Sequence, residues 1–287
     1  MGHLISKQRV LDTRDDLPAF PRVVLQILQT LDNPDASMNL LARQVEADAV
    51  IAARVLSLCN SAAHSAQGRA PVSDVFTALS LVGLARVREA AITLQLANFM
   101  RDMAPVAAQE SSWSHSLSSA VCGVELAHHS RTEVSVDASL IACLMHDVGQ
   151  LWLLRFEPEE LKICLDAAAQ RSMEIDVIER EHFGVDHGTI GSWLAQAWGL
   201  SSSICKAIQH HHTPRLGLPE PLVAIVHVSE VLSHALNLSH ARSSQVRWIS
   251  EECCALLGLE WGDEAQNLFG RIEARSRHAF APFGTDG

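Results

Sequence analysis

Hydrophobic side chains recur every three or four positions along almost the whole chain, which is the spacing of one buried face of an α-helix. No run alternates strictly between apolar and polar residues beside a hairpin turn of the Asn-Gly or Asp-Gly type. The pattern is therefore typical of an all-α protein, and we expect helices connected by short turns.

In the first third of the chain the hydrophobic stripes predict five helices. Asn, Asp, Gly and Pro residues cluster at 32–35 and 68–71, so the helical pattern should break there. Ser73 is expected to cap the helix that follows the second break. In that helix Phe76 and Leu79 are expected to face the interior.

The helical stripe lapses most clearly at 103–105, a Met-Ala-Pro sequence followed by polar residues, and it resumes near Trp113. We expect the chain to divide there into an N-terminal helical subdomain, residues 1–105, and a second helical domain, residues 106–287. The helices predicted in the second domain lie near 112–130, 135–151, 158–171, 174–183, 187–198, 201–212, 220–238, 247–257 and 262–277.

The composition is that of a globular protein. Of 287 residues, 48 % are hydrophobic and 19 % are charged, a balance unlike that of disordered segments. The 22 basic and 33 acidic residues give a formal net charge of −11, which opposes wrapping of nucleic acid by the whole surface. Residues 72–91 resemble a helix-turn-helix, but Arg86 and Arg88 are their only cations, fewer than a recognition helix usually presents. Nucleic acid is therefore not an expected partner.

No apolar stretch reaches the roughly 18 residues that a membrane-spanning helix needs. The start of the chain turns acidic where a signal peptide would have its apolar core. The seven cysteines are odd in number and include no Cys-x-x-Cys pair, which argues against a disulfide framework and a zinc ribbon. We therefore expect a cytoplasmic protein without membrane contact.

Histidine is the unusual component, with 15 residues in a chain that contains no tyrosine. His146 and Asp147 follow an apolar helix, where the loss of hydration is relieved if they bind a cation or each other. Such a pair can also be only a helix cap or a surface pair. Imidazole and carboxylate are ligands of zinc, manganese and iron, and one carboxylate can bridge two ions. Further candidate ligands stand at predicted helix ends: His115, His187, the run His210, His211 and His212, and Glu230.

Several linked motifs occur in a fixed order along residues 15–240. They are LPAFP (17–21), NPDAS (33–37), VLSLCNSA (55–62), ALSLVGL (78–84), WSHS (113–116), LMHDVG (144–149), FGVDH (183–187), WGL (198–200) and AIQHHH (207–212). In this order they resemble the HDOD family, the HD-related output domains of bacterial signalling proteins. That family belongs to the HD superfamily of helical metal-dependent phosphohydrolases.

The resemblance implies a metal centre with one or two divalent ions, iron, manganese or zinc. An adjacent histidine pair belongs to its second metal position. We take this pair as His211 and His212, because His210 stands where the family often has an aromatic residue. Whether His210 or His212 joins His211 stays open at this point. The implied ligands are His115, His146, Asp147, His187, His211, His212 and Glu230.

Two positions depart from the enzymes of the superfamily. Gln150 stands where they often have lysine, and a neutral amide stabilises the charge that develops on a phosphate less well than a cation. Glu230 stands where they have a late aspartate, and its extra methylene can move the ligand atom. A chain without tyrosine also lacks the Gly-Tyr-Pro signature of the cyclic-di-GMP phosphodiesterase branch.

We therefore expect a signal-transduction output or scaffold module that acts through contacts with bacterial signalling proteins, and that retains metal without efficient hydrolysis. A nucleotide is a candidate ligand. The alternative is a metal-dependent phosphohydrolase or phosphodiesterase acting on a nucleotide or cyclic nucleotide, with Asp147 as the catalytic, bridging ligand. Histidines outside the implied set, among them His234, are expected at the surface or the edge of the core.

Overall fold

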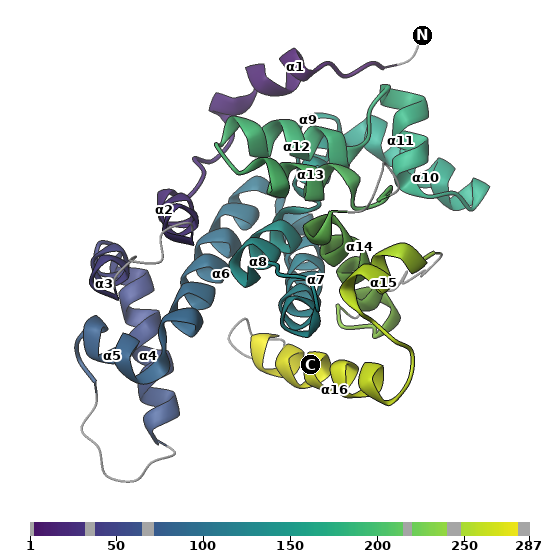
Figure 1. Cartoon of the computed structure of the whole chain (residues 1–287). Coiled ribbons are helices and arrows are strands. Elements are labelled where there is room, and N and C mark those ends of the chain that lie inside the picture. Colours follow the sequence, from purple (N-terminus) through teal and green to yellow (C-terminus); the bar gives the residue numbers. More distant parts are fainter. Residues whose placement is uncertain (1–2, 32–37, 65–71, 215–219, 240–247, 281–287) are drawn as a thin grey trace. The chain divides into compact units, whose positions relative to one another are not determined.

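The computed structural model describes residues 3–31, 38–64, 72–214, 220–239 and 248–280 (Figure 1). Every regular element within these ranges is a helix, so the predicted all-α fold is confirmed. None of the helices described is both long and apolar enough to cross a membrane. The breaks predicted at 32–35 and 68–71 lie outside the described residues.

The chain forms two compact units. One is Phe20–Phe99, and the other combines Met1–Ala19 with Met100–Gly287. The chain passes from one to the other within α6 (Leu84–Met103). A division by contacts does not test whether each segment folds by itself. The predicted subdomains, residues 1–105 and 106–287, therefore stay a prediction.

The smaller unit contains α2 (Arg22–Leu31), α3 (Met38–Glu46), α4 (Ala49–His64), α5 (Val75–Val82) and most of α6. The cap predicted for α5 is wrong by one residue, because Asp74 rather than Ser73 caps this helix and accepts from the Thr77 backbone N–H at 2.7 Å. Leu79 is buried as predicted, but Phe76 is 45 % exposed. The inward stripe consists of Val75, Ala78 and Leu79, which places Phe76 on the outer side.

The larger unit carries the remaining helices. The sequence did not predict its first helix, and the single helix predicted over 135–151 is wrong, because His146 and Asp147 interrupt it. Its elements are α1 (Lys7–Asp12), the 3-10 turns η1 (Arg14–Asp16) and η2 (Val106–Ala108), α7 (Gln109–His129), α8 (Val136–Met145), α9 (Val148–Phe156), α10 (Pro158–Arg171), α11 (Ile175–Phe183), α12 (His187–Ala197), α13 (Ser202–His210), α14 (Pro221–Ala235), α15 (Glu251–Leu257) and α16 (Asp263–Phe280).

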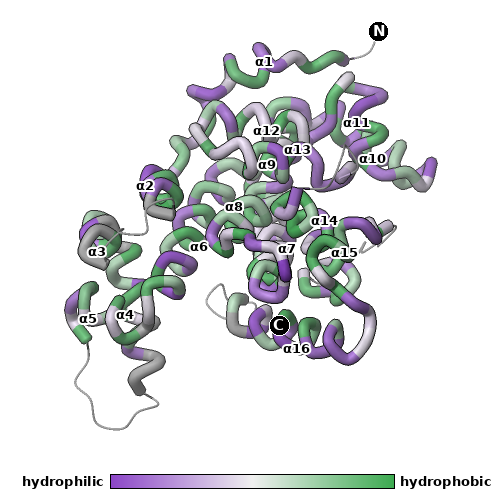
Figure 2. The backbone as a smooth tube through the Cα atoms, in the orientation of Figure 1, coloured by the Kyte–Doolittle hydropathy of each residue, from purple (hydrophilic) through white to green (hydrophobic). Residues whose placement is uncertain are grey.

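Helices α7, α8 and α14 pack together at the centre of this unit. Figure 2 shows the hydrophobic positions concentrated along α8 and α14, while α16 alternates between hydrophobic and hydrophilic positions. Small residues let these helices approach closely. Ser119 of α7 lies with its Oγ 3.4 Å from the Oγ of Ser233 on α14, and a Cβ on Gly123 would lie 2.4 Å from the sulfur of Cys143.

Glycines also set the spacing of α9, α12 and α13. A Cβ on Gly149 would lie 1.9 Å from the carbonyl oxygen of His187, and one on Gly188 would lie 2.9 Å from the carbonyl oxygen of Gln209. Because these neighbours are backbone atoms, no side-chain rotation could make room for a larger residue. The close contacts place Asp147, His187 and His211, at the ends of three helices, beside one another.

Candidate metal centre

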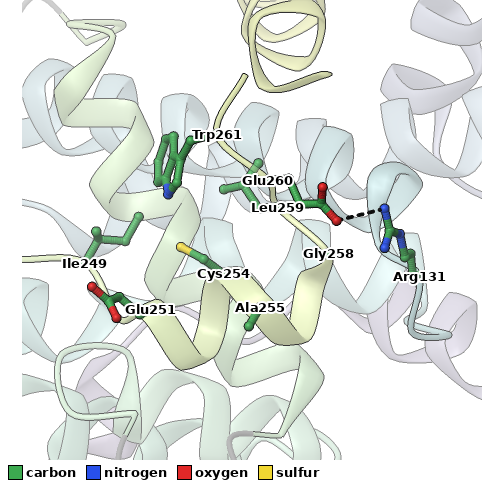
Figure 3. Close-up of a pocket in the computed structure, with 9 residues that line it drawn as sticks. All are labelled: Arg131, Ile249, Glu251, Cys254, Ala255, Gly258, Leu259, Glu260 and Trp261. Carbon is green, nitrogen blue, oxygen red and sulfur yellow. Dashed lines mark ion pairs between the residues drawn. The ribbon is translucent and has the colours of Figure 1, made fainter. Parts of the chain in front are cut away.

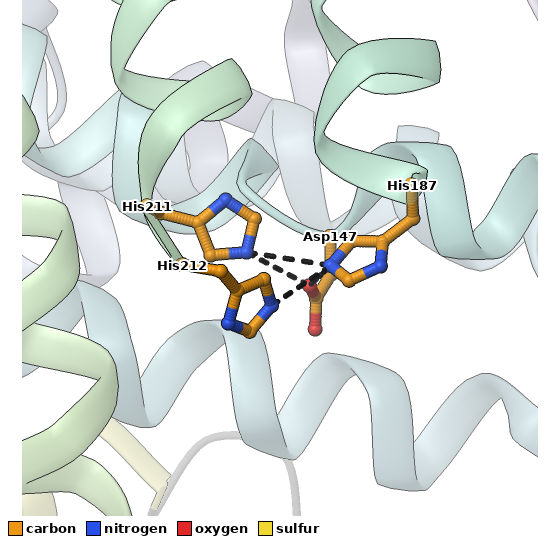
Figure 4. A group of neighbouring side chains, drawn as sticks. All are labelled: Asp147, His187, His211 and His212. Carbon is orange, nitrogen blue, oxygen red and sulfur yellow. Dashed lines mark hydrogen bonds and ion pairs between the residues drawn. The ribbon is translucent and has the colours of Figure 1, made fainter. Parts of the chain in front are cut away.

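The predicted ligands, scattered over more than a hundred residues, converge in the larger unit. His115 lies on α7, His146 and Asp147 lie in the break between α8 and α9, and His187 is the first residue of α12. The histidine pair follows α13, and Glu230 lies on α14. Figure 4 shows His187, His211 and His212 pointing toward Asp147. The residues fall into overlapping sets, and within each set one donor atom of every member lies within 4.8 Å of the others.

The Asp147 carboxylate stands between two groups of imidazoles. Its Oδ1 lies 3.4 Å from His187 Nε2 and 3.7 Å from His211 Nε2. Its Oδ2 lies 3.2 Å from His115 Nε2 and 3.4 Å from His146 Nε2. Each oxygen therefore faces its own pair of nitrogen donors, which is the arrangement of a carboxylate shared between two metal positions.

Hydrogen bonds away from the centre fix the tautomers of three imidazoles. His146 and His211 each donate from Nδ1 to a carbonyl three residues earlier, at 2.7 Å, because a carbonyl can only accept. His187 donates from Nδ1 to Oε2 of Glu179 at 2.6 Å, and the same oxygen accepts the His187 backbone N–H at 2.8 Å. In their neutral forms all three rings present the bare lone pair of Nε2 to the centre, as metal-ligating histidines do.

Charges within the cluster shift the titration of its members. Burial alone would raise the pKa of Asp147, but His146, His115 and His187 hold the pKa well below its usual range. Burial lowers the pKa of His211, and the neighbouring His212 lowers it further. Burial also opposes the charged form of His187, but Glu179 and Asp147 outweigh it and raise the pKa of His187 to about 10. Glu179 and Asp147 therefore favour a positive charge at His187, whereas burial disfavours one at His211.

The donor set fits a divalent cation. Ligand atoms about 2.1 Å from one ion lie about 3.0 to 3.4 Å apart in octahedral or tetrahedral geometry, and the Nε2 atoms of His187 and His211 are 3.4 Å apart. Imidazole and carboxylate are the donors that zinc, iron and manganese accept. His146, His187 and His211 are fully buried, whereas the other predicted ligands keep 15 to 22 % of their side chains exposed. The centre is thus closed on one side and open on the other.

Residues 17–214 match the HDOD domain family. The chain belongs to this family. An HDOD domain protein of unknown function from Geobacter sulfurreducens has the same fold, with a TM-score of 0.75, 24 % identity and 96 % of each chain covered. A candidate phosphohydrolase from Shewanella amazonensis SB2B is also similar, with a TM-score of 0.65, 20 % identity and coverage of 94 % of this chain and 97 % of that one.

Two further relatives of this HDOD chain are longer than it. A candidate signal transduction protein from Marinobacter aquaeolei VT8 has a TM-score of 0.71 and 23 % identity, over 97 % of this chain and 61 % of that one. An uncharacterised protein of Treponema pallidum (strain Nichols) is 24 % identical over 203 residues, which are 71 % of this chain and 39 % of that protein. The HDOD chain therefore spans about two fifths of this curated relative.

In this HDOD domain His212, rather than His210, lies among the candidate donor atoms around His211. His212 Nε2 lies 3.0 Å from His187 Nε2, and His212 belongs to a donor set with Asp147. His210 is in none of the sets formed by the described residues. The reason is the end of α13, because His210 is its last residue and the chain turns at His211.

Sequence reasoning left two residues of the HDOD centre out of the candidate set. His234 lies in a donor set with His115 and Glu230, and its position one turn after Glu230 on α14 is the signal that could have revealed it. Glu179 is fully buried and holds His187. No motif marks Glu179, because it becomes the partner of His187 only through the turn between α11 and α12.

A separate hollow of about 440 Å³ lies along α15 and the residues that follow it (Figure 3). Ile249, Leu259 and Trp261 contribute to its apolar lining, and Arg131 and Glu260 form an ion pair of 3.3 Å at its edge. None of the predicted metal ligands lines it. The hollow and the histidine cluster are therefore separate features of the HDOD domain.

Proposed function

We propose that this HDOD protein is a signal-transduction module that binds one or two divalent ions, iron, manganese or zinc, at the histidine cluster and acts through contacts with other bacterial signalling proteins. The observation that carries the metal proposal is the set of three Nε2 atoms, on His146, His187 and His211, held toward Asp147 by hydrogen bonds on the far side of each ring. Because its pKa is raised to about 10, His187 would release a proton when it binds the ion. Membership of the HDOD family supports the signalling role.

The two groups around Asp147 suggest how the ligands would divide. His187, His211 and His212 would hold an ion on the Oδ1 side, while His115 and His146 would hold one on the Oδ2 side. Glu230 approaches His211 and His212 at 3.9 Å and 3.8 Å and shares a donor set with His146 and His211, so it would contribute a ligand between the two positions. A bound ion would supply positive charge that polarises a ligand oxygen.

The charges around the cluster favour metal retention over efficient hydrolysis. The groups that shift the pKa values of its members most are other histidines and carboxylates, with no lysine or arginine among them. Gln150, where the enzymes often have lysine, supplies no charge. Charge developing on a phosphate would therefore be stabilised by bound ions alone.

The first experiment measures the metal content of tag-free protein by elemental analysis, beside Asp147→Asn and the control Asp166→Asn. Asp166 is an exposed carboxylate on α10, far from any donor set, where it pairs with Lys162. We expect near-stoichiometric metal in the wild type and in the control, and its loss in Asp147→Asn. Equal metal in all three proteins, or none in any after loading with iron, manganese or zinc, would overturn the proposal.

A metal-dependent phosphohydrolase acting on a nucleotide or cyclic nucleotide is the second candidate, favoured by the shared Asp147 carboxylate and by the open side of the cluster. Metal-loaded protein is incubated with mononucleotides and cyclic dinucleotides. The scaffold proposal expects no more product from the wild type than from Asp147→Asn. Metal-dependent turnover that disappears in Asp147→Asn would instead establish the enzyme.

A further inference from the structure

Besides the two donor sets that contain Asp147 and the set of His146, His211 and Glu230, the described residues form one further set. It consists of His115, Glu230 and His234, and one donor atom of each residue lies within 4.8 Å of the other two. All three side chains are partly exposed, in contrast to the buried imidazoles at the closed side of the centre. His234 is not among the ligands that the family resemblance implies, so this set extends the centre beyond them.

The packing of α7 against α14 holds the set in place. Glu230 and His234 are one turn apart on α14 and therefore share a face of that helix. His115 lies on α7, and its ring centroid is 5.0 Å from that of His234, with the two planes inclined by 31°. The contact between Ser119 and Ser233 lies one turn further along α7 and keeps the two helices close.

The chemistry of the set is that of a cation site. Two imidazoles and one carboxylate on one side of an ion leave its remaining positions open, an arrangement that iron(II) proteins use. Donor atoms about 2.1 Å from one ion are at most about 4.2 Å apart. Small side-chain rotations would therefore bring the three donors into one coordination shell.

We propose that His115, Glu230 and His234 form an additional cation-binding position on the open side of the centre, with His234 as a direct ligand. This inference rests on the proposed metal binding at the cluster. His115 and Glu230 are shared with the inner sets, so an ion at the additional position competes for donors and binds more weakly than an ion beside Asp147.

The test titrates the metal-stripped protein with Co²⁺ and Mn²⁺, following heat and the visible absorption of cobalt. The variants are His234→Gln, Asp147→Asn and the control His128→Gln, which removes an exposed histidine from α7 outside the donor sets. We expect a tight phase and a weaker phase in the wild type and in the control. His234→Gln should weaken only the weaker phase, at least tenfold, whereas Asp147→Asn should remove the tight phase.

A second variant gives a direct signature of ligation. In His234→Cys a thiolate would replace the imidazole, and its coordination to Co²⁺ would add a sulfur-to-cobalt charge-transfer band in the near ultraviolet. The wild type and His128→Cys should lack this band. If folded His234→Gln titrates like the wild type and His234→Cys shows no band, the additional position is refuted. The proposed function would still stand if Asp147→Asn loses the tight phase, and both proposals would fail if no variant binds metal.

Discussion

Replacing Gly149 by alanine tests whether close packing of α9 on α12 builds the centre. The added methyl carbon would lie 1.9 Å from the His187 carbonyl oxygen and 2.6 Å from the Gly191 nitrogen. Non-bonded carbon and oxygen atoms normally stay about 3.3 Å or more apart, so the two helices must separate by about 1.4 Å. Overpacking of this kind costs about 1 to 3 kcal/mol or more. We expect the upper end, about 3 kcal/mol, because both obstructing atoms are backbone.

The assay is thermal unfolding of the metal-free protein together with metal affinity. About 3 kcal/mol in a domain of this size corresponds to a fall in Tm of about 6 to 12 °C. Metal affinity should fall too, because ligand distances tolerate only about 0.2 Å and His187 is itself displaced. The control is Gly270→Ala in α16, where a Cβ would meet nothing within 4 Å. There alanine should stabilise the helix by about 0.5 to 1 kcal/mol.

If Gly149→Ala unfolds within a degree of the wild type and binds metal normally, the helices can separate without disturbing the donors. The close approach of α9 and α12 would then not determine the geometry around Asp147.

Three further predictions concern the surroundings of the ligands. Glu179→Gln should weaken metal binding about 10- to 100-fold in chelator competition, since it removes the anion that orients His187; unchanged affinity would show that Glu179 is only a packing residue. His227→Phe should lower the free energy of unfolding in urea by about 2 kcal/mol or more, because His227 donates to the His211 carbonyl and accepts from the Ser250 N–H; an unchanged urea midpoint would contradict this. The free energy of unfolding of the wild type should be about 4 kcal/mol lower in the presence of a chelator than in the presence of free metal ion at a thousand times its Kd. A Tm that does not change when the chelator is added would argue against a bound ion.

Local features of the chain were predictable, because they depend on neighbours in sequence. Helical periodicity gave the all-α class. The predicted position of the ligands at helix ends holds for His146, His187 and His211 but is wrong for His115 and Glu230, which lie inside α7 and α14. The break between α8 and α9 was missed because apolar residues continue at helical spacing from Leu140 to Leu153, straight through His146 and Asp147. A pattern of hydrophobicity cannot register such a break.

Contacts between segments that are distant in the sequence could not be predicted from the sequence patterns. The need for glycine at 149 comes from a carbonyl of His187, 38 positions later in the chain. The roles of Glu179 and His234 depend on which helices pack against each other. The sequence of a single helix does not reveal its packing partners. The choice between His210 and His212 depended on the residue at which α13 ends, and helix ends are the least certain part of a prediction from periodicity.

The hydrogen bonds from His146 and His211 join each ring to the carbonyl three residues before it, Cys143 and Ile208. Both carbonyls belong to the last turn of a helix, where the backbone leaves carbonyl groups without partners. Each ring is therefore oriented by a contact within a span of four residues, without help from distant parts of the chain. If the cluster binds metal as proposed, two of its ligands owe their orientation to the helix that carries them rather than to the packing of α8 against α13.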